Sequence, residues 1–168
     1  MSAARFAILM ACAAALLCAA CAVSPEDESR RQAKEADIAA ILSIQLDPDE
    51  YGAPLRCLTD NQIRTFRALD DRRILFEGRH GKLWINTLRM PCQDLRYGDV
   101  LLVKSFSGLR LCDMDSFQVT DWFHWPWYRR WPWHWGGGWG IGPSCSLGKF
   151  QPVTPGQVAE IEAILKSR

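Results

Sequence analysis

Two aspartates separated by one residue are the first group in this sequence whose spacing suggests chemistry. Asp113-Met114-Asp115 has the D-x-D pattern that occurs in sugar-nucleotide enzymes. No nucleotide-binding βαβ pattern surrounds the pair, although such enzymes depend on one. We therefore expect Asp113 and Asp115 to lie in a turn or at a strand end after Cys112.

Other catalytic patterns are incomplete or absent. Gly136-Gly137-Gly138 lacks the Lys-Ser/Thr pair and the following helix of a phosphate-binding loop, and neither G-x-S-x-G nor H-E-x-x-H occurs. Only three histidines are present, so a nucleophile and its base have few candidates, and His80 reads as a solvated turn residue. We expect no catalytic residues, no cofactor and no enzymatic activity.

The most unusual composition lies between Trp122 and Trp139, where seven of the eight tryptophans occur. His124-Trp125-Pro126-Trp127 and Trp131-Pro132-Trp133-His134 are mirror images about Tyr128-Arg129-Arg130. A hairpin with a three-residue turn would place four indoles on one face, and His124 opposite His134 on the other. In such a hairpin, Pro126 and Pro132 are tolerated only at non-hydrogen-bonded pairs, where no N–H is needed. The alternative to the hairpin is a low-complexity insertion without regular structure.

Exposed indoles in such number indicate an interaction surface. Its predicted members are Trp125, Trp127, Trp131, Trp133, Trp135, Arg129 and Arg130. Four roles fit: packing on the chain's own sheet, contact with the membrane interface, stacking on glycan rings, or weak metal capture by His124 and His134. Because two histidines are few ligands for a metal, we assign no metal site.

The mature chain has four cysteines besides Cys21, namely Cys57, Cys92, Cys112 and Cys145. An even number in a small exported domain predicts two disulfides. Of the three possible pairings we favour Cys92–Cys112, around the strand at 100–104, with Cys57–Cys145 joining the ends of the β region. A zinc site is the rival, but no pair has the C-x-x-C spacing.

Several short pieces of the sequence resemble a family of small exported bacterial proteins known only as a domain of unknown function. The pieces are Cys57-Leu58, Asp70-Asp71 before Ile74-Leu75-Phe76, Pro91-Cys92-Gln93-Asp94-Leu95, Leu111-Cys112-Asp113-Met114-Asp115, and Cys145-Ser146-Leu147-Gly148-Lys149-Phe150. The resemblance covers about residues 55–165 and implies export and a shared fold, but no catalytic residues. The tryptophan-rich run is not part of the pattern and reads as an insertion at 121–143.

The first twenty residues read as an export signal. Arg5 supplies a positive charge, Phe6–Leu17 is apolar, and small residues follow. Ala19-Ala20-Cys21 resembles a bacterial lipobox, which implies a lipidated Cys21 as the mature N-terminus, and Ala22 then suggests the outer membrane. Conventional cleavage after Ala20-Cys21-Ala22 and an uncleaved anchor are the alternatives.

The remaining chain predicts a helix, a β domain and a second helix. Ser24 and Pro25 begin a charged helix that runs to about Gln45, and residues 47–54 break it. Strands are expected at 63–69, 73–77, 83–87, 100–104, 117–120 and 146–150. Thr154, Pro155 and Gln157 form a capping box before a C-terminal helix that should pack on the sheet or barrel mouth.

The fold class predicted is therefore mainly β: a small antiparallel barrel or sandwich with two disulfides, an N-terminal stalk helix and a C-terminal helix. The expected segments are a lipoprotein signal at 1–20, an anchor and charged stalk at 21–54, and a disulfide-stabilised domain at 55–168.

The net charge of the chain restricts the classes of partner that it can bind. The chain has 20 Lys and Arg against 19 Asp and Glu, and removal of the signal takes away Arg5 and leaves a net charge of zero. A nucleic-acid partner is therefore not expected. The sequence favours a non-enzymatic envelope lipoprotein on the periplasmic face of the outer membrane, held by its lipid anchor. A periplasmic module that binds a glycan or an apolar ligand is the alternative.

Overall fold

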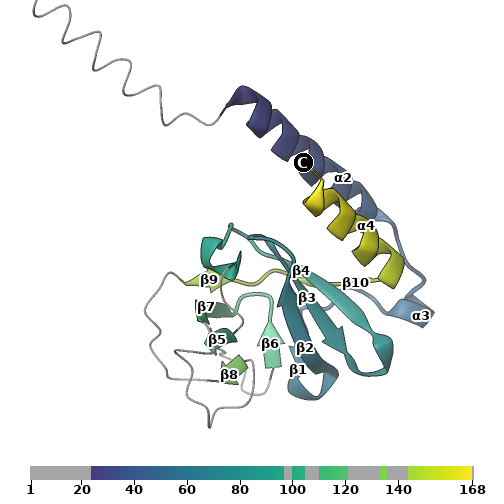
Figure 1. The fold of residues 1–168 in the computed structure, drawn as a ribbon. Helices are drawn as coiled ribbons and strands as arrows, with labels where there is room; N and C mark the ends of the chain where they lie inside the picture. Colours follow the sequence, from purple (N-terminus) through teal and green to yellow (C-terminus); the bar gives the residue numbers. More distant parts are fainter. Residues whose placement is uncertain (1–23, 97–99, 105–109, 121–132, 136–143, 168) are drawn as a thin grey trace, which may run out of the picture. The chain divides into compact units, whose positions relative to one another are not determined.

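The computed structural model describes residues 24–96, 100–104, 110–120, 133–135 and 144–167 (Figure 1). The chain divides into two compact units, Met1–Asp37 and Ile38–Arg168. Among the described residues, no helix combines the length and the apolar character needed to cross a membrane.

Helix α2, Pro25–Ser43, begins in the first unit and confirms the predicted N-terminal helix. Ser24 caps it by accepting a hydrogen bond from the backbone N–H of Glu26 at 3.2 Å. Acidic residues fill its first turn, where they favour the positive end of the helix dipole. An i,i+4 ion pair between Arg30 and Glu26 supports the exposed surface of this part of the helix.

The second unit contains the β domain. One four-stranded antiparallel sheet has the order β10-β4-β3-β2. Its strands are Phe150–Val153, Leu83–Thr87, Arg73–Gly78 and Ile63–Ala68, respectively. A second four-stranded sheet has the order β8-β5-β7-β9, and β1 pairs with β6 in a two-stranded sheet. Those strands are Trp133–Trp135, Val100–Lys104, Ser116–Thr120, Cys145–Ser146, Cys57–Thr59 and Arg110–Cys112.

The sheets are arranged as in a sandwich, and the described strands do not close into a barrel (Figure 1). Short 3-10 turns at Asp60–Gln62, Arg79–Gly81 and Gln93–Arg96 connect the elements, and helix α4, Pro155–Lys166, ends the chain. The predicted mainly β fold with a C-terminal helix is therefore confirmed.

Strand β3 is buried on both faces, and this places two layers of core around it. Ile74 and Phe76 belong to one cluster with Leu101 and Phe117 of the second sheet. Leu75, between them in sequence, points into another cluster, because successive side chains of a strand face opposite sides.

The second cluster joins the sheet to two helices. Val158 and Ile161 of α4 pack with Leu75 and with the fully buried Ile38 near the end of α2. This confirms that the C-terminal helix covers the sheet. The predicted capping box is also present, since Thr154 accepts from the Gln157 N–H and Gln157 accepts from the Thr154 N–H.

One predicted strand was wrong in its extent. The segment 146–150 is not continuous: β9 ends at Ser146, and β10 begins at Phe150 in the other sheet. Gly148 lies at the crossing, where a Cβ would stand 2.1 Å from the Thr87 carbonyl oxygen. Only glycine permits that approach, so the chain changes sheets at this position.

Candidate functional site

The four cysteines of the β domain form two disulfides, as expected, but the predicted pairing was wrong. Cys57 is bonded to Cys112, and Cys92 is bonded to Cys145. The predicted Cys92–Cys112 and Cys57–Cys145 bonds do not occur.

The register of the two-stranded sheet explains the first bond. β1 and β6 place Cys57 directly opposite Cys112. The neighbouring Asp113 N–H donates to the Arg56 carbonyl at 2.7 Å, so the cysteines occupy the next, non-hydrogen-bonded pair. Cα atoms approach most closely at such pairs, and here they are 4.0 Å apart.

The tryptophan-rich segment, residues 121–143, is attached to one sheet at both ends. Strand β7 leads into it at Thr120, and β9 follows it. β7 and β9 are adjacent and antiparallel, with Phe117 opposite Cys145. The Cys92–Cys145 disulfide joins β9 to the loop after β4, so the strand that follows the segment is covalently fixed to another part of the domain.

Part of the segment adds to that sheet. Trp133–Trp135 forms strand β8, which pairs in parallel with β5, Leu101 opposite Trp133 and Val103 opposite Trp135. The predicted hairpin has an extended arm that overlaps this strand, but the sequence did not predict its pairing with β5.

The other predicted surface residues, Trp125, Trp127, Trp131, Arg129 and Arg130, lie outside the described residues, as do Cys21 and His124. The predicted hairpin, residues 124–134, also lies mainly outside the described residues.

Asp113 and Asp115 have structural roles, as expected from their context. Asp113 is 5% exposed, and its carboxylate pairs with the Arg56 guanidinium at 3.2 Å. Asp115 is 2% exposed and its carboxylate accepts a hydrogen bond from the Cys112 N–H at 2.8 Å. Both therefore hold the turn that follows the Cys57–Cys112 bond.

Other polar groups are likewise used in folding. Buried Arg73 pairs with Asp70 across the β2–β3 turn, and His80 lies exposed in a turn with a φ of 60°. Within the described ranges, no three His, Cys, Asp or Glu side chains gather as a metal site.

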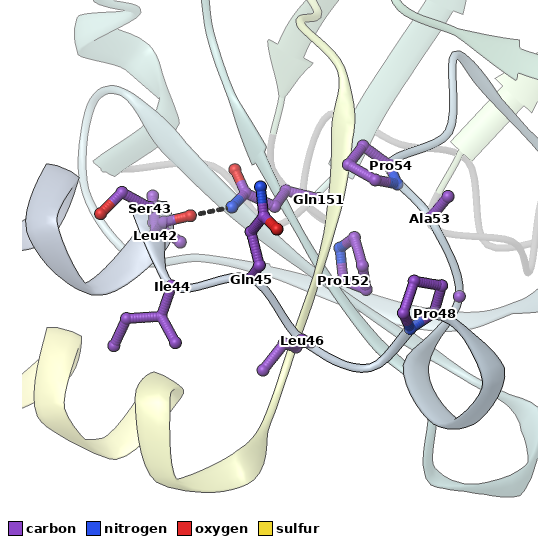
Figure 2. A pocket seen from close by; sticks show the side chains of 11 residues that line it. Leu42, Ser43, Ile44, Gln45, Leu46, Pro48, Ala53, Pro54, Gln151 and Pro152 are labelled. Carbon is purple, nitrogen blue, oxygen red and sulfur yellow. Dashed lines mark hydrogen bonds between the residues drawn. The ribbon is translucent and has the colours of Figure 1, made fainter.

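A groove of about 280 Å³ lies where α2 ends beside β10 (Figure 2). Most of its lining is apolar, with three amide or hydroxyl side chains among it. The lining comprises Leu42, Ser43, Ile44, Gln45, Leu46, Pro48, Gly52, Ala53, Pro54, Gln151 and Pro152. Pro48 is the first residue of the one-turn helix α3, Pro48–Tyr51, and Gly52 follows its last residue.

Two amides fix the end of α2 against this wall. Gln151 donates its side-chain N–H to the Leu42 carbonyl, as Figure 2 shows. Gln157 donates to the Ile41 carbonyl at 3.1 Å. The last carbonyls of a helix lack partners within it, so these glutamines stabilise the helix end. The groove had no sequence signal, because its walls come from segments about a hundred residues apart.

The two disulfides fit a protein exported from the cytoplasm, because such bonds persist in oxidising compartments. No curated protein and no solved structure matches this chain. A family model does match, over residues 4–124, a range that begins and ends earlier than the expected 55–165. That range covers well over half of the 168 residues and confirms the resemblance to a domain of unknown function. The chain belongs to the family of unknown function DUF6491.

Proposed function

We propose that this protein is a lipid-anchored, non-enzymatic interaction module of the cell envelope. Its tryptophan-rich segment contacts the membrane interface, and Cys21 carries the lipid. The periplasmic face of the outer membrane is the proposed location.

The attachment of the tryptophan-rich segment to a braced sheet carries this proposal. β7 and β9 hold its two ends side by side, and Cys92–Cys145 fixes β9. Indoles are enriched at membrane interfaces, and Arg129 and Arg130 supply charges that attract anionic head groups. A lipid on Cys21 would already keep the domain near a bilayer.

The use of buried charges in the fold supports a non-enzymatic role. Arg56 neutralises Asp113, Asp70 pairs with Arg73, and Asp115 binds the Cys112 N–H. Each of these groups is held in place by a contact that the domain needs for its own turns.

Mass spectrometry of the mature protein tests the anchor. An acylated N-terminal Cys21 is the expected result. A free N-terminus at Val23 or Ser24 without acyl mass would exclude the lipid.

Vesicle binding tests the role of the indoles separately. The unacylated chain from Ala22 onward should sediment with vesicles that contain anionic phospholipid. The double variant Trp125→Ser, Trp127→Ser should lose most of this binding. Glycan-binding activity is the alternative, and binding to peptidoglycan fragments without binding to vesicles would replace the membrane proposal with it.

A further inference from the structure

We propose that the groove between the end of α2 and β10 binds an extended peptide segment of a partner protein, one that carries an apolar side chain next to a Lys or Arg. This proposal does not depend on the role of the tryptophan-rich segment.

The groove has room for one or two side chains of a larger ligand. Pockets for whole drug-sized molecules have volumes of about 300–1,000 Å³, and this groove has about 280 Å³. One or two side chains of a peptide fit that space better than a complete cofactor or a long acyl chain.

Its surface favours an apolar side chain. Ile44, on the lining, is 57% exposed, although it is a large aliphatic residue. Leu46 and three prolines also line the groove, and in Figure 2 the Gln45 and Gln151 side chains lie between Ile44 and the prolines. Burial of such surface is the main source of affinity for an apolar group.

The peptide cannot bind as an additional strand of the sheet. Phe150 and Leu55 exchange backbone hydrogen bonds of 2.8 and 2.9 Å on the outer edge of β10. Two residues further on, Pro152 faces the same edge without an N–H to donate. Contact with side chains, rather than strand addition, therefore determines binding here.

The charge around the groove selects a cation. Asp47, Asp49 and Glu50 are all exposed beside the lining residue Pro48. The C-terminal end of α2 also faces this region, and its last turn has no basic residue to offset the negative end of the helix dipole.

The Glu50 carboxylate also acts on its neighbour Tyr51. Its hydrogen bond with the Tyr51 hydroxyl, and then its charge, raises the pKa of Tyr51. These groups favour Lys or Arg and disfavour a fatty acid or an anionic head group.

Fluorescence anisotropy with two labelled peptides tests this site on the full mature chain. In one peptide Leu alternates with Arg, and in the other Leu alternates with Glu. The Arg peptide should bind at least tenfold more tightly, and its affinity should fall as salt rises. Equal affinities, or no binding of the Arg peptide, would overturn the proposal.

Two matched variants locate the binding. Ile44→Ser should weaken binding of the Arg peptide at least fivefold, whereas Met90→Ser should not, because Met90 is 72% exposed but outside the groove. Both side chains are on the surface, so both variants should fold. Equal losses in the two variants, or loss of vesicle binding in Ile44→Ser, would refute a peptide site at the groove.

The double variant Asp49→Asn, Glu50→Gln tests the charges. It should lower the affinity for the Arg peptide at least threefold and flatten the salt dependence, while the Glu peptide should bind no worse. An unchanged salt dependence would contradict the assignment of a cationic partner.

Discussion

Asn86 shows how one buried amide can hold two sheets in register. Its side chain is fully buried, donates to the Gly148 carbonyl at 2.6 Å and accepts from the Gly148 N–H at 2.9 Å. The backbone of Gly148 crosses from one sheet to the other at this point and has no strand partner of its own. The Asn86 side chain therefore gives the Gly148 backbone the two hydrogen bonds that a neighbouring strand would otherwise provide.

Replacement of this amide should be costly. Asn86→Ala leaves a buried N–H and a buried carbonyl of Gly148 without partners, and we expect a loss of about 2–4 kcal/mol in the free energy of unfolding. Urea denaturation measures this loss. Gln32→Ala removes an exposed amide that bonds to Glu28 and should change stability by less than about 0.5 kcal/mol. Similar values for the two variants would contradict the role of Asn86.

Glu162 gives the fold a pH-dependent contribution. Hydrogen bonds from Arg67 and from Lys166 lower the pKa of Glu162 below its ordinary value of 4.5, against a smaller opposing effect of burial. A carboxylate with a lowered pKa stabilises the folded state at a pH above its ordinary pKa, and this contribution disappears as the pH falls through the folded pKa.

The pH dependence should identify this group. Glu162→Gln should lower the melting temperature slightly at pH 7, by an amount equivalent to less than about 1 kcal/mol since the ion pairs are partly exposed. The difference from the unaltered protein should begin to shrink as the pH falls through the ordinary pKa of 4.5 and should vanish below the lowered pKa of the folded state. A difference that stays constant down to pH 3 would assign the effect to packing.

Helix α4 illustrates which local signals a sequence conveys. Thr154, Pro155 and Gln157 predict its first residues because capping is a contact within four residues. The short β-like run at 83–87 and the apolar run at 100–104 likewise predict β4 and β5 with their observed bounds. Each of these signals is complete within its own segment.

Gln157 also makes a long-range contact that a local sequence signal does not predict. Its side chain caps α4 and also bonds to the Ile41 carbonyl at the end of α2. The second bond spans 116 positions and follows only from the way α4 and α2 cover the sheet. The short strand β8 is comparable, because its pairing with β5 depends on distant residues.

The two roles of Gln157 predict an unequal effect. Thr154→Ala should cost about 1 kcal/mol as the loss of one cap. Gln157→Ala should cost roughly 2 kcal/mol, because it removes the bond to the Thr154 N–H and also one of the two hydrogen bonds that the Ile41 carbonyl accepts. Chemical denaturation of the two variants provides the comparison, and an equal loss would mean that the bond to Ile41 contributes nothing.

At the scale of the whole molecule, the disulfides join parts of the β domain that are far apart in the sequence. Cys57–Cys112 joins the start of the β domain to its middle, and Cys92–Cys145 joins the middle to the strand after the tryptophan-rich segment. Counting cysteines predicts two bonds. The pairing requires the register of β1 with β6, which spacing along the chain does not encode.

The two bonds should differ in how they stabilise the protein. Their sequence separations of 55 and 53 are nearly equal, so the loss of chain entropy should be similar, about 2–4 kcal/mol each. Cys92 and Cys145 are buried, and Cys92→Ala, Cys145→Ala should therefore cost about 1 kcal/mol more than Cys57→Ala, Cys112→Ala because of the cavity left behind. Urea denaturation of both double variants tests this order, and the reverse order would contradict it.

The central proposal is that the tryptophan-rich segment contacts the membrane interface. Trp84 is buried at 4% exposure in the core, so it provides a constant background for the fluorescence of the other seven indoles. The direct measurement is quenching of tryptophan fluorescence in vesicles whose phospholipids carry bromine at defined depths in the acyl chains. Strong quenching by bromines near the head groups, together with a blue shift, is the predicted result. Fluorescence that neither shifts nor is quenched at any depth would contradict membrane contact.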